Sequence, residues 1–174
     1  MPFYILSNKK IFGHKFDYLM RDSGRRLEPT LLPTKKSQSR DSQNKGPTHT
    51  WAIELMSKEL IKLKPTDSIK DALEQMDQKR IHHLPIVDGE NIIGIVSDRD
   101  LLKIRDQSSL LKSQLDLQWF MSKITILCHE ETPIDHIAKV FCNEHINGIL
   151  VIGSDHKLTG IITHHDLLKW IYDK

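Results

Sequence analysis

Two short segments of the sequence place a hydroxyl three residues ahead of a carboxylate. They are Ser97 with Asp100 and Thr163 with Asp166, and each follows a run of one glycine and two β-branched residues. Such a run is typical of a buried strand, and the Ser or Thr then marks the turn into a helix. A carboxylate there can accept two hydrogen bonds from vicinal hydroxyls such as those of a ribose, and helix N-terminal amides suit a phosphate. The other interpretation is that both carboxylates only cap their helices.

Two histidine pairs, His82-His83 and His164-His165, suggest a metal site, which we discount. Neighbours in an extended chain point to opposite faces, so one ion could not easily bind both members of a pair. No Cys or carboxylate cluster follows at ligand spacing, so we expect no structural or catalytic metal. Mg²⁺ would come only with a nucleotide, held by phosphates and water. Motifs for a phosphate loop, a serine nucleophile or a zinc protease are missing, so the chain is not expected to be an enzyme by itself.

These motifs belong to an internal repeat. A shift of 65 residues places Met56 on Met121, and after one inserted residue Gly94 falls on Gly160. The register then holds as far as the helices that contain the two carboxylates. A single insertion over this length makes coincidence improbable, so the sequence predicts two copies of one unit.

Each copy has the same pattern of elements. Apolar residues at helical spacing predict a helix from residue 69 and another from residue 134. Two apolar runs follow each helix, at 84–87 and 92–96 and at 149–152 and 158–162, and a final helix begins near each carboxylate. The order strand, helix, strand, strand, helix predicts a mixed α/β (α+β) fold. A sheet of so few strands needs cover, so the two copies should pack as a pseudo-two-fold pair.

The chain is predicted to divide into an N-terminal arm with a linker (1–50), a first repeat (51–108) and a second repeat (109–174). The first 50 residues carry ten Lys and Arg against four Asp and Glu, so the arm is basic. Residues 29–49 have few apolar side chains and predict a disordered linker. Residues 3–19 could form a short strand pair or an extended, flexible arm that docks on the main domain or on a partner. Residues 104–118 connect the copies and are expected to contribute a helix.

Composition points to a cytoplasmic protein. Hydrophobic residues make up 39% of the chain and charged residues 28%, as in soluble proteins. No apolar run is long enough for a membrane span or a signal peptide. Cys128 and Cys142 fit no ligand or pairing pattern and are expected to be free thiols. The basic pairs Arg25-Arg26 and Lys35-Lys36 lack interleaved aromatic residues, so nucleic-acid binding by the arm is only an alternative.

With these motifs in place, the sequence resembles the cystathionine-β-synthase (CBS) domain family from about residue 51 to 173. The resemblance rests on His82-His83-Leu84-Pro85-Ile86-Val87-Asp88, on the segment 94–101 and on the segment 160–167. The residues of these segments are most similar to those of bacterial stand-alone proteins of the acetoin-utilisation type. The resemblance implies a regulatory pair whose clefts bind AMP, ADP, ATP or S-adenosylmethionine. It also implies a homodimer of pairs and an unknown protein partner.

The resemblance further implies two ligand sites. The first would comprise Ser97, Arg99, Asp100, Ile126, Asn147 and Gly148, and the second Thr163, His165, Asp166, Ile61, His82 and His83. Arg99 can bind a phosphate through two hydrogen bonds, whereas His165 is a weaker cation whose charge depends on pH. Gly148 would also let the backbone approach an adenine, where His83 would stack or obstruct. We therefore expect the phosphate-rich ligand at the first site and a less charged ligand, or none, at the second. The alternative function is a dimerisation scaffold that binds no ligand.

Overall fold

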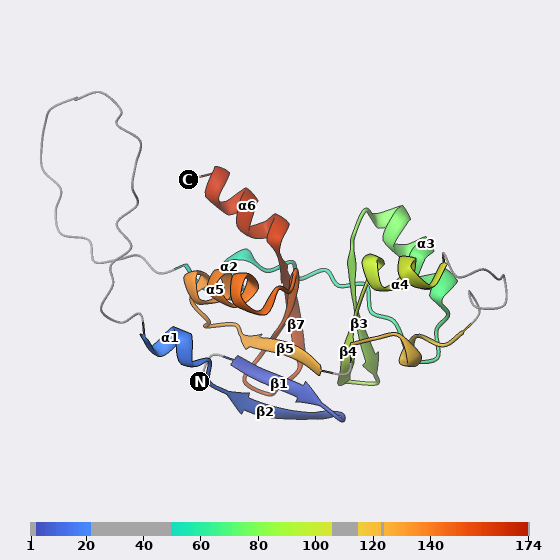
Figure 1. Cartoon of the computed structure of the whole chain (residues 1–174), viewed down its shortest axis with the longest axis horizontal. Coiled ribbons are helices and arrows are strands. Elements are labelled where there is room, and N and C mark those ends of the chain that lie inside the picture. Colours follow the sequence, from blue (N-terminus) through green and yellow to red (C-terminus); the bar gives the residue numbers. More distant parts are fainter. Residues whose placement is uncertain (1–2, 22–49, 106–114, 123, 174) are drawn as a thin grey trace, which may run out of the picture.

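The computed structural model describes residues 3–21, 50–105, 115–122 and 124–173, which form two α/β units side by side (Figure 1). The first unit comprises α3 (Ile69–Lys79), β3 (His83–Asp88), β4 (Asn91–Ser97) and α4 (Asp98–Arg105). The second comprises β5 (Ile124–His129), α5 (Ile134–Glu144), β6 (Gly148–Ile152), β7 (Leu158–Thr163) and α6 (His164–Tyr172). The duplicated α/β fold predicted from the sequence is confirmed.

The two units repeat each other down to their helix ends. A capping box starts α3, in which the Asp71 N–H donates to Ser68 Oγ and the Asp71 carboxylate accepts the Ser68 N–H. Both α3 and α5 end on a residue in the left-handed region, Arg80 and His145, each with φ of 54°. That conformation stops the helix and turns the chain toward the next strand.

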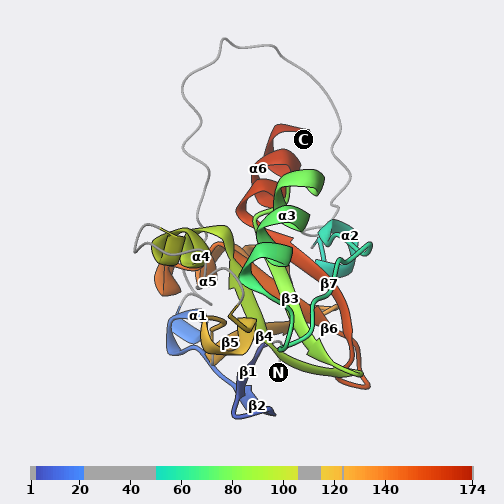
Figure 2. The same cartoon turned by 90° about the vertical axis from the view of Figure 1, so that its right-hand side faces the viewer.

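The leading strand differs between the units. In the second unit β5 pairs in parallel with β6, and β6 pairs antiparallel with β7. In the first unit this strand is reduced to one parallel bridge between Leu63 and Ile86, beside the antiparallel pair β3 and β4. Figure 2, with the first unit toward the viewer, shows α3 and α6 on the same side of the strands.

The segment that precedes each unit in the sequence packs in the core of the other unit. Helix α2 (Ala52–Leu55) precedes the first unit, yet the buried side chains of Ala52 and Met56 pack in the core of the second. In return, Leu117 precedes the first strand of the second unit, yet it is fully buried in the core of the first unit. Backbone hydrogen bonds from Ser57 to Ile161 and from Ser122 to Ile95 hold these segments in place, so the pair folds as one body.

Gly94 lies where one of these crossing segments contacts β4. A Cβ at this position would lie 2.7 Å from the backbone oxygen of Ser122. Because that oxygen belongs to a hydrogen-bonded crossing segment, we expect Gly94→Ala to lower the free energy of unfolding by about 2 kcal/mol, as overpacking does. Urea unfolding measures this. Gly153→Ala is the matched control, since its Cβ would meet only the side chains of Asp155 and Thr159; equal losses in the two variants would contradict the explanation.

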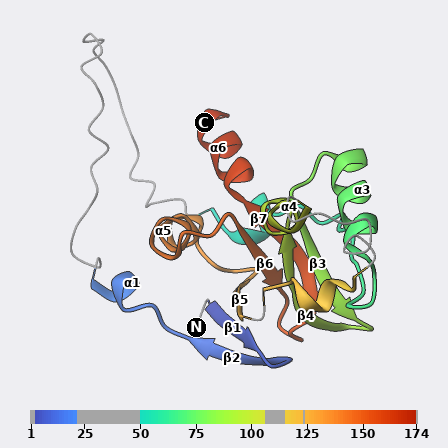
Figure 3. The same cartoon turned by 45° about the vertical axis from the view of Figure 1, so that its right-hand side comes forward.

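Residues 3–14 form a hairpin that joins the second unit's sheet. The strands are β1 (Phe3–Ser7) and β2 (Lys10–His14), joined by a two-residue turn whose residues, Asn8 and Lys9, have φ of 50° and 62°. The sheet has the order β2-β1-β5-β6-β7, and the hairpin lies along its β5 edge (Figures 1 and 3). Of the possibilities left open by the sequence, the strand pair docked on the main domain is the one observed.

Helix α1 (Asp17–Arg21) completes the docking, because the Tyr18 hydroxyl donates to Glu144 at 3.0 Å and its ring stacks on Phe16. Residues 3–21 therefore pack on the second unit and do not extend from it as a flexible arm.

Three expectations lie wholly or partly outside the described residues. They concern the linker 29–49, the basic pairs at 25–26 and 35–36, and the helix expected within 104–118. Of the connector, the described residues show the end of α4 at Arg105 and a 3₁₀ turn at Leu117–Trp119.

Candidate functional site

A cavity of about 660 Å³ lies between the two units. This volume lies within the range of small-molecule sites in proteins. Its lining residues come from both units and from the crossing segment before α3. They are Ser57, Glu59, Leu60, Ile61, Arg80, Ile81, His82, His83, Pro85, Ser97, Asp98, Arg99, Asn147, Ile161, Thr163, His164, His165 and Asp166.

Thr163 and Asp166 form part of the cavity wall at the N-terminus of α6. Oδ2 of Asp166 accepts hydrogen bonds from the Thr163 N–H and from the Thr163 hydroxyl, each at 2.7 Å. This is a capping box, so the carboxylate does cap its helix. Within the described part of the chain, the second oxygen, Oδ1, has no hydrogen-bond partner. The half-buried carboxylate can therefore cap the helix and still accept bonds from a ligand.

Ser97 and Asp100 have the same local geometry at the start of α4. The Ser97 hydroxyl donates to Asp100 Oδ2 at 2.6 Å, and the Asp100 N–H donates to Ser97 Oγ at 3.3 Å. Ser97 lines the cavity, but Asp100 is not among its lining residues. The two motifs are thus equivalent in structure and differ in their position relative to this cavity.

His82 contacts the carboxylate of Asp98, which the sequence analysis did not assign to either site. Its Nδ1 lies 2.7 Å from Oδ2 of Asp98, and the Asp98 N–H donates to the His82 carbonyl oxygen. In the second unit the His164 N–H donates to the Asn147 carbonyl in the corresponding way. His82 therefore lies on the wall of the cavity, held to the first turn of α4.

His83 packs against Gly148 of the other unit. A Cβ on Gly148 would lie 3.0 Å from His83 Cδ2, so the glycine leaves room for the imidazole ring. The sequence analysis predicted that an adenine occupies the space beside Gly148. In the structure the His83 side chain occupies it. Burial lowers the pKa of His83, with opposing contributions from neighbouring charges.

The lowered pKa of His83 predicts acid sensitivity. Desolvation is the main cause; His82 and His164 act in the same direction, whereas Asp98 and Asp100 oppose it. Since the unfolded chain binds the proton more readily, stability should be complete above the ordinary histidine pKa of about 6.5 and fall as the pH drops below it. We expect His83→Gln to lose less stability than the wild type between pH 7.5 and 5.5, as measured by urea unfolding. Equal losses would show that His83 does not titrate on folding.

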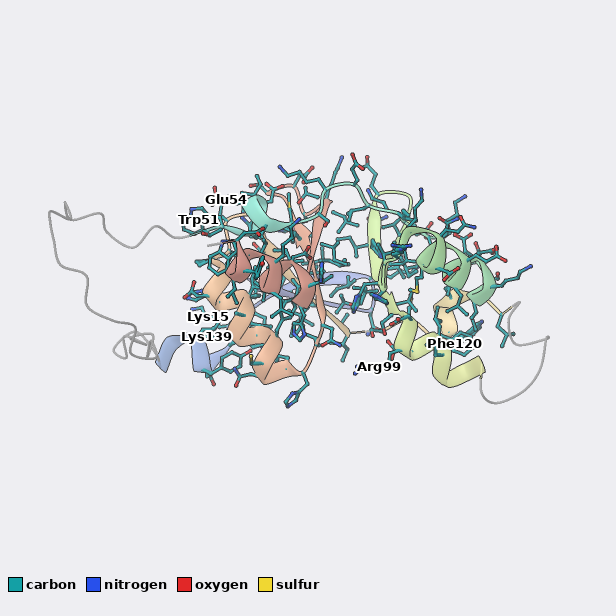
Figure 4. The ribbon with its side chains drawn as sticks, turned by 90° about the horizontal axis from the view of Figure 1, so that it is seen from above. Lys15, Trp51, Glu54, Arg99, Phe120 and Lys139 are labelled. Atoms are coloured by element: carbon teal, nitrogen blue, oxygen red, sulfur yellow. The ribbon has the colours of Figure 1, made fainter. Side chains whose placement is uncertain are left out.

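Cationic side chains gather on the cavity wall. Arg80 is the residue that ends α3, and Arg99 lies in the first turn of α4, between the two units (Figure 4). The cavity wall also contains the imidazoles of His82, His83, His164 and His165 and the carboxylates of Glu59, Asp98 and Asp166. The sequence analysis grouped Arg99 with Asp100, whereas the structure places it in the wall that contains Asp166.

Most of the predicted site residues line this one cavity, although the sequence analysis divided them between two sites. All six residues of the second predicted site line it, together with Ser97, Arg99 and Asn147 of the first. Asp100, Ile126 and Gly148 do not line it. Arg80, Asp98 and Glu59 were missed. Asp98 sits inside the quoted motif and could have been found there, but nothing in the sequence marks Arg80.

A serine and a histidine also meet on the surface of the second unit. Nε2 of His129 lies 3.3 Å from Ser154 Oγ, and Nδ1 accepts the Glu131 N–H. A neutral imidazole that accepts at Nδ1 carries its proton on Nε2, so it donates to the serine. This pair is not arranged as a base and a nucleophile.

Three further findings describe the rest of the molecule. Among the described residues, no three His, Cys, Asp or Glu side chains come close enough to hold a metal ion. Cys128 is buried and Cys142 exposed, and both are free; burial raises the pKa of the Cys128 thiol. No helix in the described ranges combines the length and apolarity needed to cross a bilayer.

Two α/β units with exchanged segments and a cavity between them define a paired α/β module. The chain belongs to the CBS domain family, whose model matches residues 52–106 and 116–173.

Solved structures of CBS pairs are similar to this chain. The CBS domain pair of protein MJ0100, in complex with 5′-methylthioadenosine and S-adenosyl-L-methionine, is 27% identical, with a TM-score of 0.65, over 72% of this chain and 98% of that one. A putative acetoin utilisation protein from Vibrio cholerae is 27% identical, with a TM-score of 0.65, over 72% of this chain and 92% of that one. The resemblance to acetoin-utilisation proteins is thus confirmed at the level of fold and sequence.

The first curated relatives are longer than this chain. L-aspartate semialdehyde sulfurtransferase of Methanocaldococcus jannaschii is 29% identical over 119 residues, which are 68% of this chain and 22% of that protein. The chain spans less than half the length of the first curated relatives it matches, between 22% and 43%.

Proposed function

We propose that this chain is a regulatory module that binds an adenine nucleotide or a related adenosyl ligand in the cavity beside Asp166. The observation that carries the proposal is the Thr163–Asp166 cap, whose free carboxylate oxygen lies in the wall of a cavity formed by both units. The ligands of the MJ0100 pair, which are adenosyl compounds, support the same chemistry.

The cavity offers partners for each part of such a ligand. Asp166 accepts the two ribose hydroxyls, and Ile61 and Ile161 provide apolar surface for the base. Arg80 and Arg99 then suit a phosphate, and Mg²⁺ would bind through the phosphates rather than through a protein cluster. The proposal therefore places the phosphate-rich ligand beside Asp166, the reverse of the assignment made from sequence alone.

The role is regulatory because the ligand would contact both units at once. A ligand that binds one arrangement of the units more tightly than another shifts their populations by its difference in affinity. The shift changes the surface that a protein partner meets.

Arg99→Ala tests the phosphate contact. Removing a charge-assisted bond of about 1.5 kcal/mol should weaken ATP binding by about tenfold, while adenosine binding should change less than about twofold. Isothermal titration of both ligands measures this, with Lys79→Ala on the exposed side of α3 as the control. Equal losses for ATP and adenosine, or no loss for either, would contradict the assigned role of Arg99.

A second proposal, a homodimer of pairs, is favoured by exposed apolar side chains on α2 and α6. Leu168, Ile171 and Tyr172 are 66%, 62% and 88% exposed, and Ile53 on α2 is 40% exposed. Apolar side chains gathered on neighbouring helices are typical of an interface. Sedimentation at micromolar concentration, with and without AMP, distinguishes a dimer from a monomer and shows whether the ligand changes the association.

A further inference from the structure

The N-terminal hairpin packs on both units at once. Side chains alternate along β1, so Phe3 lies on one face of the strand and Leu6 on the other. Phe3 packs in the core of the second unit. Leu6 is 1% exposed and belongs to a cluster of buried residues that also contains Ile92 of β4 and Leu127 of β5. The hairpin therefore buries one face in the second unit and the other face between the two units.

The second strand of the hairpin and its turn extend this attachment. Ile11 of β2 pairs with Leu6 in the register of the sheet and packs against the same cluster. In the turn, Lys9 Nζ lies 3.9 Å from Oδ2 of Asp88 in the first unit. Both charged side chains are 66% exposed, so the ion pair contributes little to stability. The apolar contact of the hairpin is therefore what fastens it to the first unit.

The hairpin meets the first unit at the end of β3 and β4 that points away from the cavity. These two strands pair antiparallel, and their open end, at His83 and Ser97, lines the cavity. Their closed end is the turn that follows Asp88, the residue that Lys9 contacts. Figure 1 shows the turn between β1 and β2 next to that end.

The strands of the second unit are arranged in the same way. Thr163 at the end of β7 lines the cavity, whereas the turn between β6 and β7 lies at the other end of these strands. In that turn, Lys157 Nζ lies 2.9 Å from Oε2 of Glu90 in the corresponding turn of the first unit. The two units are thus joined at the closed ends of their strand pairs, and the cavity lies between the open ends.

The cluster around Leu6 also reaches the cavity. Leu60 and Ile161 line the cavity and pack in the same cluster as Leu6. Because close-packed side chains transmit strain to their neighbours, a displacement of Leu6 changes the position of the cavity wall.

We infer that the hairpin is a strap that holds the two units in the arrangement that binds the ligand, so that attachment of the hairpin and occupancy of the cavity stabilise each other. The inference rests on the proposed function. The hairpin lies outside the residues matched by the CBS model, so this control is additional to the paired repeats. The coupling is reciprocal: if the attached hairpin raises the affinity for the ligand, the bound ligand strengthens the attachment by the same factor.

The first test is a calorimetric titration of AMP into the wild type, Leu6→Ala and Phe12→Ala. Leu6→Ala removes a side chain that is buried between the units, and we expect it to weaken AMP binding by about fivefold or more, the lower end of typical coupling between sites. Phe12→Ala is the matched control in the same hairpin, because Phe12 is 54% exposed and pairs with Ile5 on the other face of the sheet. It should weaken AMP binding by less than about twofold. Circular dichroism confirms that each variant is folded.

The second test needs no variant, so it also applies if Leu6→Ala does not fold. Hydrogen exchange of the β1 amides is measured in the wild type with and without saturating AMP. Only amides whose exchange rates do not change with low concentrations of urea are compared, because these exchange through local opening. AMP should slow their exchange by about fivefold or more, the same factor as in the titration.

The outcomes separate the strap from the proposed function. No AMP binding to the wild type would refute the proposed function itself. AMP binding to the wild type with unchanged affinity in folded Leu6→Ala, or with unchanged exchange of the β1 amides, would overturn the strap and leave the proposed function in place.

Discussion

Asp166→Asn is expected to weaken AMP binding to the cavity by about 100-fold. The carboxylate accepts two ribose hydroxyls in the proposed complex, and charge-assisted bonds contribute about 1.5 to 3 kcal/mol each. The amide keeps the shape of the side chain but offers only one acceptor oxygen and no charge. A loss of about 2.7 kcal/mol corresponds to this factor of 100, and isothermal titration at 25 °C measures it.

Asp100→Asn is the matched control, because Asp100 has the same capping geometry but does not line the cavity. It should retain AMP binding in the cavity within about threefold. Both variants change a carboxylate that accepts a hydrogen bond from the hydroxyl at the start of its helix, and we expect this to cost about 1 kcal/mol of stability. Unchanged affinity in Asp166→Asn would mean that the carboxylate only caps α6.

Phe3→Ala is expected to lower the free energy of unfolding by about 3 to 4 kcal/mol, the loss typical of a buried Phe. Phe3 is 1% exposed and packs edge-to-face on Phe16 with ring centroids 5.4 Å apart. It lies outside both repeats, so a loss of this size would show that the hairpin belongs to the core of the second unit. Urea unfolding followed by circular dichroism measures the change.

Phe12→Ala provides the comparison within the same hairpin. Since Phe12 is 54% exposed, its removal should cost less than about 1 kcal/mol. A small loss for Phe3→Ala as well would indicate that the hairpin docks only weakly on the folded pair.

The repeat and its elements could be predicted because they depend on local patterns. The apolar spacing at Ile69, Ala72 and Met76 gave α3, and the same spacing after Ile134 gave α5. The register between the copies extends to details that no single pattern contains, such as the left-handed residues Arg80 and His145. Local interactions decide the helices, which is why they could be predicted, whereas the left-handed residues at their ends could not.

The assignment of residues to one cavity could not be predicted in full, because it depends on how the units pack. Arg99 and Asp100 are neighbours in sequence, yet only Arg99 lines the cavity. Gly148 was expected to make room for a ligand, whereas His83, its counterpart in the first unit, fills that room. The docking of Phe3 against α5 likewise follows from a free strand edge on β5, which exists only once the second unit has folded.

The most direct test of the central claim is a titration of the wild-type chain with AMP, ADP, ATP, S-adenosylmethionine and NAD, followed by calorimetry and thermal unfolding. A ligand present at 100 times its dissociation constant should stabilise the protein by about 2.7 kcal/mol. We predict saturable binding and a raised melting temperature for at least one adenine nucleotide, with the affinity lowered about 100-fold in Asp166→Asn. No heat and no shift with any of the five compounds would contradict the account and would favour a scaffold that binds no adenosyl ligand.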